Sequence, residues 1–221
     1  MRTVLNSATI ALLSGLPVVA IAQELTFSAN IALTSEYMSQ GFELSDGPAL
    51  QIYAEAAYAG FYFGAFGSNL SPDLSGADSS VDLYLGKAGD IGKFYYDIGV
   101  AYYFYQNATW AVDYEEYYVS AGYAVTPSLY ATVYYGNAPH YEQHDIALTV
   151  DYYSNIAGLA VSATYGDVRT NYGEWNYWSV GGSYEVSDAV SVDLTYHGAD
   201  DNGAGVGVTD GILTATVAYA F

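Results

Sequence analysis

Acidic side chains recur at matching positions in the strand-like segments of this 221-residue sequence. Five of them fall about three to six residues from a predicted short turn, which at roughly 3.3 Å per residue places them on one level of a sheet. These five are Glu55, Asp82, Asp97, Asp151 and Asp193. Glu36 and Glu116 are predicted to lie farther from these turns, and no basic residue shares the face, since Lys87 and Lys93 flank a turn and Arg169 falls in a loop. Such a set of carboxylates would concentrate cations and repel anions.

The same face carries a set of tyrosines, of which Tyr84, Tyr95 and Tyr118 join the seven carboxylates as candidate pore-lining residues. The other members are Tyr53, Tyr62, Tyr103, Tyr130, Tyr134, Tyr153 and Tyr177. Their hydroxyl groups could instead hold the carboxylates in a filled, sealed interior. We favour a conducting interior, because buried carboxylates without partners need water.

The three histidines do not form an arrangement typical of a catalytic or metal site. His140 and His144 share a loop with two acids, but histidines four residues apart converge on one ion only on a helix, which this loop does not offer. His197 is followed by Gly198 and Ala199, so the His-x-Ser arrangement of barrel phospholipases is missing, as is the Asp-x-His of barrel proteases. The sequence therefore predicts no enzyme.

The acidic stretch Asp200-Asp201-Asn202-Gly203, with Asp210 beyond it, is a candidate calcium loop. It lacks the full ligand spacing of a calcium-binding loop, and Asp-Asn-Gly is common in turns. We therefore predict neither a metal nor a cofactor.

The elements that must position these side chains are β-strands, because apolar residues alternate with polar ones at a period of two almost throughout. Leu25, Phe27, Ala29 and Ile31 lie on one face of the first segment, and no segment shows a 3.6-residue period. The twelve predicted strands centre on residues 25–33, 50–58, 61–65, 81–85, 94–104, 117–123, 129–135, 146–152, 159–165, 178–184, 190–196 and 213–221. One hairpin more or fewer also fits the pattern, and residues 70–80 are its least regular part.

The connections between these segments are predicted to alternate in length. The short turns lie near residues 59–60, 88–92, 125–128, 154–158 and 186–188. The longer loops cover residues 38–47, 70–79, 106–112, 136–143, 166–174 and 198–209. Alternation of this kind is typical of an outer-membrane barrel, with short periplasmic turns, long external loops and both chain ends on the periplasmic side.

The apolar face is aliphatic at its centre and aromatic at both ends, as in Phe94, Ile98 and Phe104. Aromatic rings at two heights suit the two interfaces of a membrane. A soluble core would instead have to bury many tyrosine hydroxyls and find a partner for each.

Composition and the chain ends agree with an exported protein. Arg2, the apolar run 8–19 and Ala20-Ile21-Ala22 predict a secretory signal peptide at residues 1–22, which leaves 23–221 as the barrel. A net charge of −20 excludes nucleic-acid binding, and the lack of cysteine excludes a disulfide scaffold. The terminal Phe221 resembles the signal that the barrel-assembly machinery reads, so we expect that machinery, outer-membrane lipid and lipopolysaccharide as partners.

Several short motifs resemble one family of proteobacterial outer-membrane proteins, Gcw_chp, also called the TorF-type porins. The motifs are Ser35-Glu36-Tyr37, Ser45-Asp46-Gly47-Pro48-Ala49-Leu50-Gln51, Gly60-Phe61-Tyr62, Gly67-Ser68-Asn69, Asp82-Leu83-Tyr84, Tyr96-Asp97-Ile98-Gly99-Val100 and Asp113-Tyr114. The resemblance covers most of the chain after residue 22, is most specific between residues 33 and 123, and implies an exported β-barrel without a defined substrate. The family usually has arginine before the glycine of its first loop, where this sequence has Gln40 before Gly41. If that arginine offsets the acids of the lumen, this protein should prefer cations more strongly than its relatives.

The sequence thus predicts an all-β fold, a single antiparallel up-and-down transmembrane barrel of twelve strands in the outer membrane of a Gram-negative bacterium. The predicted function is a passive channel for small solutes or cations. The alternative is a non-conducting structural or adhesion-type barrel that acts through its external loops.

Overall fold

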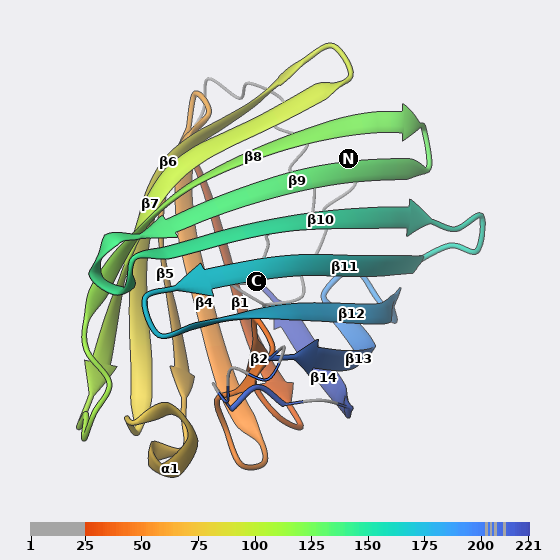
Figure 1. Cartoon of the computed structure of the whole chain (residues 1–221). Coiled ribbons are helices and arrows are strands. Elements are labelled where there is room, and N and C mark those ends of the chain that lie inside the picture. The colour runs from red at the N-terminus through yellow and green to blue at the C-terminus, as the bar shows by residue number, and fades with distance from the viewer. Residues whose placement is uncertain (1–24, 202, 204, 206, 210) are drawn as a thin grey trace.

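The computed structural model describes residues 25–201, 203, 205, 207–209 and 211–221, and the predicted signal peptide lies outside this part of the chain. Twelve strands form one closed antiparallel barrel, as predicted (Figure 1). In chain order the barrel strands are β1 (Thr26–Thr34), β4 (Ala49–Tyr58), β5 (Phe61–Asn69), β6 (Ser79–Ile91), β7 (Phe94–Gln106), β8 (Tyr114–Thr126), β9 (Leu129–Ala138), β10 (Gln143–Tyr153), β11 (Leu159–Thr170), β12 (Gly173–Glu185), β13 (Val190–Asp200) and β14 (Ile212–Ala220).

Four small elements lie in the connections at one end of the barrel. β2 (Met38–Ser39) and β3 (Phe42–Glu43) pair as a short hairpin, α1 (Pro72–Ser75) is a single helical turn, and η1 (Pro139–Tyr141) is a 3₁₀ turn. No helix among the described residues is long and apolar enough to cross a membrane.

Each barrel strand pairs with its neighbour in sequence, and β1 closes the ring by pairing with β14. This seam joins five residues of β1, Asn30 to Thr34, to residues 216–220. The ladder between β6 and β7 is far longer and joins all thirteen residues of each strand. β1 begins and β14 ends at the end of the barrel that carries the short turns, as the sequence predicted.

The two faces of the barrel wall differ as the period of two predicted. Ile98 is 58% exposed on the outer face, whereas its neighbour Asp97 is 6% exposed on the inner face. The same contrast separates Leu50 from Gln51. An apolar exterior around a polar interior reverses the arrangement of a soluble β-protein and is that of a membrane barrel.

The predicted length of the connections was wrong in three places. β6 and β7 are joined by a two-residue turn at Gly92-Lys93, not by residues 88–92. The predicted loop 166–174 is likewise a two-residue turn, and the loop at 136–143 shrinks to residues 139–142. Strand pairing continues in β11 and β12 because Val168 and Trp175 face each other and are buried on the inner side.

Glycine and tyrosine side chains face each other across neighbouring strands on the inner wall. The pairs are Gly64 with Tyr84, Gly86 with Tyr62, Gly99 with Tyr118, and Gly166 with Tyr177. A Cβ atom on any of these glycines would overlap the ring of its partner. The missing Cβ therefore lets each ring lie flat over the neighbouring strand instead of projecting toward the barrel axis.

Candidate functional site

Four of the predicted carboxylates lie in the half of the barrel near the short turns. Asp97 and Asp151 are buried there, and Glu55 and Asp193 are half-buried, all on the inner face. Tyr62 Oη donates to Asp97 Oδ1 at 2.5 Å, and Thr195 Oγ1 donates to Asp193 at 2.8 Å. Each of the four lies two or three residues from the end of its strand at the short turns.

Asp82 lies at the other level, so its predicted place beside Asp97 was wrong. Because β6 runs to Ile91 before it turns, Asp82 is near the loop end and pairs with Tyr103 of β7. Its side chain is only 2% exposed, and its Oδ1 has no hydrogen-bond partner among the described residues. Asp82 therefore belongs with Glu116, which accepts hydrogen bonds from Tyr134 and, at 3.2 Å, from Tyr103.

Asp145 is a third carboxylate at this level, and it was not among the predicted lumen residues. It is one of the two acids predicted to share a loop with His140 and His144, but β10 begins at Gln143, so Asp145 points inward with Asp151. Tyr177 Oη lies 3.2 Å from Asp145 Oδ2, and Gln40 Nε2 donates to the same oxygen at 2.9 Å. The signal that could have found it is parity, since the alternation of β10 extends without a break from residue 151 to residue 143.

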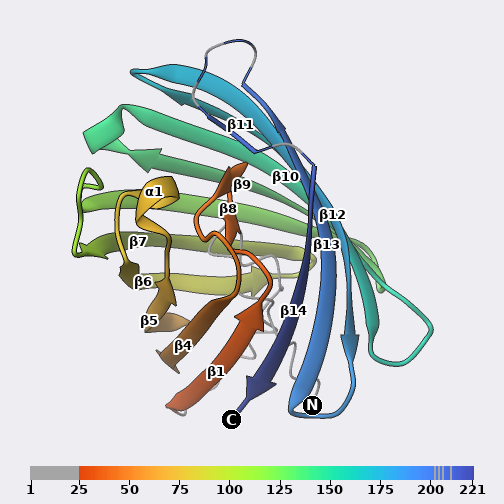
Figure 2. The ribbon, with the colours of Figure 1, turned by 90° about the horizontal axis from the view of Figure 1, so that it is seen from below.

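The first connection, residues 35–48, folds into the mouth of the barrel and brings Gln40 to Asp145 (Figure 2). Trp175 Nε1 donates to the Gln40 carbonyl at 2.7 Å, and the Thr209 amide donates to the Gly41 carbonyl at 2.7 Å. Gly41 has a φ of 89°, and a Cβ there would lie 2.8 Å from the Cβ of Ala199. Only glycine therefore allows this close approach to β13. We call residues 35–48 the inward loop.

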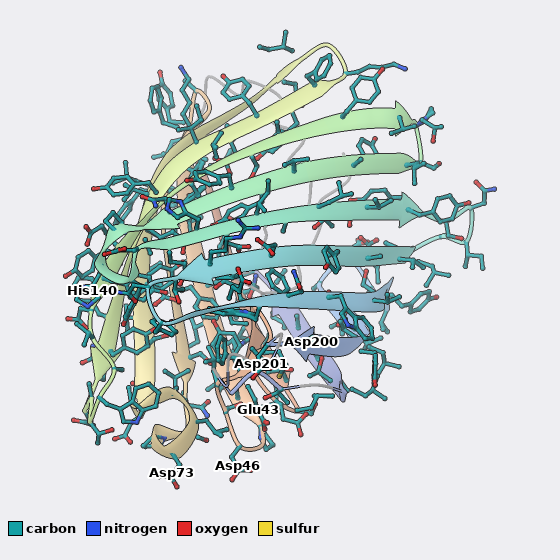
Figure 3. The ribbon with its side chains drawn as sticks, viewed as in Figure 1. Glu43, Asp46, Asp73, His140, Asp200 and Asp201 are labelled. Carbon is teal, nitrogen blue, oxygen red and sulfur yellow. The ribbon has the colours of Figure 1, made fainter. Side chains whose placement is uncertain are left out.

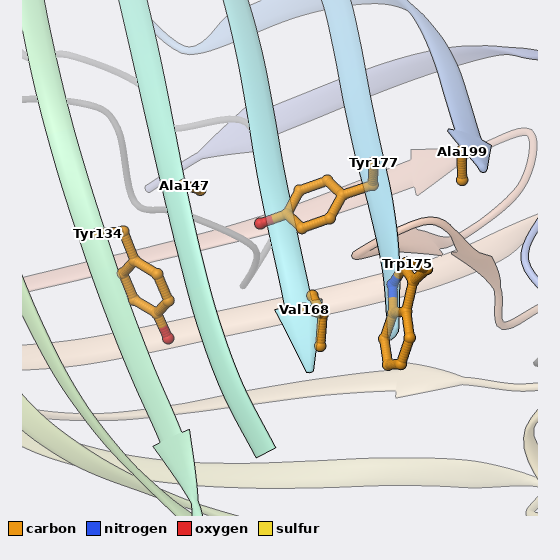
Figure 4. Close-up of a cluster of buried hydrophobic side chains, with 6 residues drawn as sticks. All are labelled: Tyr134, Ala147, Val168, Trp175, Tyr177 and Ala199. Atoms are coloured by element: carbon orange, nitrogen blue, oxygen red, sulfur yellow. The ribbon is translucent and has the colours of Figure 1, made fainter. Parts of the chain in front are cut away.

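The inward loop rests on a cluster of buried side chains at the loop end (Figure 4). The cluster consists of Tyr134, Ala147, Val168, Trp175, Tyr177 and Ala199. Phe42 of β3 packs edge-on against Trp175, with ring centroids 5.0 Å apart. The loop is thus held against the wall opposite its own strands.

Two titratable groups of the inward loop are shifted by its surroundings. Burial, together with the charge of Asp82, raises the pKa of Tyr37 well above its usual range. Burial and the nearby carboxylates of Glu36 and Asp46 raise the pKa of Glu43. Glu36 itself is half-buried and accepts a hydrogen bond from Ser35 at 3.1 Å.

Basic side chains lie outside the barrel interior throughout the described residues. Lys87 is on the outer face, 4.6 Å from the ring centre of Phe61, and Lys93 is exposed in the turn after β6. Arg169 is exposed and lies 3.0 Å from Asp167. The loop end carries further acids, and Figure 3 shows Glu43, Asp46, Asp73, Asp200 and Asp201 there. Negative charge therefore extends from the mouth into the interior without a basic counterpart.

The inner wall has an aromatic half and a hydroxyl half. From β4 to β9 it carries inward tyrosines, among which Tyr53 stacks on Tyr84 and Tyr118 stacks on Tyr134. The predicted lumen tyrosines Tyr84, Tyr95 and Tyr118 all lie in this half. From β10 to β14 and into β1 serine and threonine dominate, as in the pairs Thr149–Thr164 and Thr34–Thr216, each with oxygens 2.9 Å apart.

The other candidate groups have local partners. His144 lies on the outer face, 2.7 Å from Tyr135 Oη, and His197 Nε2 faces the interior, 3.1 Å from Thr214. In the candidate calcium loop, of which residues 202 and 210 lie outside the described part, Asp201 accepts hydrogen bonds from the amides of Gly203 and Gly205 at 2.9 Å. The described residues contain no group of three or more potential metal ligands.

The fold and its polar interior define a porin-like barrel. The KdgM porin aligns with a TM-score of 0.67 and 11% identity over 88% of this chain and 99% of that chain, including a structure in complex with disordered oligogalacturonate. The NanC porin aligns with a TM-score of 0.58 and 10% identity over 88% and 98% of the two chains. No match was found among curated proteins. The chain belongs to the family described as a bacterial protein of unknown function (Gcw_chp), whose profile matches residues 20–217.

Proposed function

We propose that this protein is a passive outer-membrane channel for small solutes that prefers cations. The observation that carries the proposal is the charge of the inner wall, where the described residues include carboxylates at two levels and no lysine or arginine. These carboxylates are Glu55, Asp82, Asp97, Glu116, Asp145, Asp151 and Asp193. A passing cation is attracted by each of them and an anion is repelled.

The orientation of the tyrosine rings supports conduction. Twelve strands give an interior between the filled barrels of eight strands and the wide channels of sixteen, so the space that the side chains occupy decides whether solutes pass. The pairing of glycine with tyrosine lays rings such as those of Tyr84 and Tyr62 along the wall. A carboxylate oxygen such as Asp151 Oδ2, which lacks a protein partner among the described residues, is stabilised when water reaches it.

The negative charge of the interior does not suit the solute that its structural neighbour binds. Oligogalacturonate, with which the KdgM porin was solved, is a polyanion. The acidic interior described above would repel such a molecule, so we do not extend that solute to this chain and propose cationic or neutral solutes instead.

The proposed location is the outer membrane, with the short turns in the periplasm. The apolar outer face and the barrel fold support it. No part of the proposal needs a catalytic group, so we expect transport without chemical change of the solute.

A planar bilayer experiment tests the channel. Purified protein under a KCl gradient should conduct and give a reversal potential on the cation-selective side. Glu116→Gln should move this potential toward zero, whereas Glu115→Gln should not, because Glu115 sits one residue away on the opposite face of β8. Asp97→Asn should act like Glu116→Gln.

Three outcomes would contradict the proposal. A folded barrel without conductance would favour the structural or adhesion-type function, in which the inward loop closes the mouth. An anion-selective reversal potential would overturn the role of the inner carboxylates. Equal shifts from Glu115→Gln and Glu116→Gln would show that facing the interior does not matter.

A further inference from the structure

A series of aromatic rings follows the inner rim of the barrel at the loop end. The ring centres of consecutive members are 5.0 to 6.5 Å apart. We call this series the aromatic track, and its members are Tyr105, Tyr114, Tyr141, Tyr172, Trp175 and Phe42. They come from β7, β8, η1, the turn between β11 and β12, β12 and β3, so six separate elements converge on the track.

The track reaches the surface at Tyr172 and is buried or half-buried on both sides of it. Tyr172 is 55% exposed in the turn before β12, whereas Trp175, on which its ring stacks, is only 1% exposed. On the other side of Tyr172, Tyr141 and Tyr114 are half-buried. A solute arriving from the loop side would thus contact rings of the track before it reached the interior.

Buried carboxylates lie directly beside the track. Asp82, Tyr103 and Tyr114 pair in one row across β6, β7 and β8, and the rings of Tyr103 and Tyr114 stack with centres 4.6 Å apart. Asp82 is therefore separated from Tyr114 of the track by Tyr103 alone, and its buried Oδ1 has no hydrogen-bond partner among the described residues. Glu116, two residues from Tyr114 on the same face, adds a second charge.

This combination of aromatic rings and carboxylates favours some classes of solute over others according to their charge and their apolar surface. The face of an aromatic ring carries negative electrostatic potential and attracts cations, and the carboxylates add attraction of the same sign. Small inorganic ions hold their water too firmly to gain much from the rings, while anions are repelled by Asp82 and Glu116. Neutral molecules can stack but gain nothing from the charges.

We propose that the aromatic track binds small organic cations, in which an ammonium group is attached to an apolar or aromatic body. The proposal deepens the proposed function, because it names the class of solute that the cation-preferring channel would select at its mouth.

Binding to the full-length protein, refolded in detergent, tests the proposal without requiring conduction. Isothermal titration calorimetry would compare benzylammonium with benzyl alcohol and benzoate, which share its ring and differ in charge. Benzylammonium should bind most tightly and benzoate should not bind. Tyr172→Leu should weaken benzylammonium binding about three- to tenfold, the range expected for one cation–π contact, and Tyr172→Phe should restore it to within about twofold.

The matched control is Tyr58→Leu, because Tyr58 is 54% exposed, close to the 55% of Tyr172, but lies at the short-turn end. It should leave binding unchanged. Equal binding of benzylammonium and benzyl alcohol would overturn the proposal, as would equal effects of Tyr172→Leu and Tyr58→Leu. A barrel that binds benzylammonium but does not conduct would refute only the channel, and a conducting barrel that does not bind it would refute only the track.

Discussion

Replacing Gln40 with arginine should reduce the cation preference of the channel. Gln40 Nε2 donates to Asp145 Oδ2 at 2.9 Å, so a guanidinium group at this position can form an ion pair with the carboxylate. The substitution adds one positive charge to the inner surface where the inward loop meets β10. It tests directly the consequence of having glutamine where the family usually has arginine.

The size of the effect follows from the position of the new charge. Two unit charges about 4 Å apart interact by about 1 kcal/mol in water, so with an assumed separation of about 7 Å the new charge contributes about 0.6 kcal/mol to the energy of a passing ion. Salt at about 0.1 M has a Debye length of about 10 Å and halves this energy. The remaining energy acts with opposite sign on cation and anion, so their permeability ratio should change about threefold. A lower effective dielectric constant in the interior would enlarge the change.

The assay is the reversal potential of Gln40→Arg in a planar bilayer. Gln40→Met is the control, because it removes the hydrogen bond to Asp145 without adding charge, and it should keep the wild-type potential. The difference should shrink near 1 M KCl, where the Debye length is about 3 Å. A folded, conducting Gln40→Arg channel with the wild-type potential at low salt would refute the assignment of Asp145 to the ion pathway.

Two further predictions concern folding. Gly64→Ala should destabilise the barrel by about 1–3 kcal/mol, as overpacking does, because the new methyl group would overlap the ring of Tyr84. The control is Gly67→Ala on the same strand, where the methyl group meets only Ser80 O at 3.6 Å. Urea unfolding of both variants measures the difference in stability, and equal losses would contradict the role of the Gly64–Tyr84 pair. The inward loop should become more ordered as the pH falls, because the pKa of Glu43 is raised in the folded loop and ionisation therefore disfavours that state at neutral pH. Hydrogen exchange of residues 35–48 between about pH 7 and pH 4 would show this, and a pH dependence that survives Glu43→Gln would rule out Glu43 as its source.

The strands could be predicted from the sequence because their signal is local. An outward apolar residue such as Ile98 beside an inward acid such as Asp97 fixes the parity of a strand without knowledge of its neighbours. Strand ends were harder, because small residues break the contrast between the faces. Ala88 and Gly89 suggested a turn, yet they continue β6, and the error moved Asp82 to the wrong level.

The arrangement of the mouth could not be predicted because it depends on contacts between distant residues. The bond from Gln40 to Asp145 joins positions 105 residues apart, and no periodic pattern specifies it. The pairing of Gly64 with Tyr84 likewise depends on the register between two strands. One residue of slip would place the tyrosine over a different neighbour and turn its ring away from the wall.

The unequal ladders of the barrel also determine how it would respond to force. The seam between β1 and β14 holds five paired positions, with one further backbone bond from Phe221 to Ala29 at one end and one from Ser35 to Ala215 at the other. The β6–β7 ladder holds thirteen paired positions. Tension along the circumference of the wall would therefore separate β1 from β14 first, and the ring would open as one curved sheet with its other ladders intact. The seam that closes the ring is thus also the mechanical weak point of the wall.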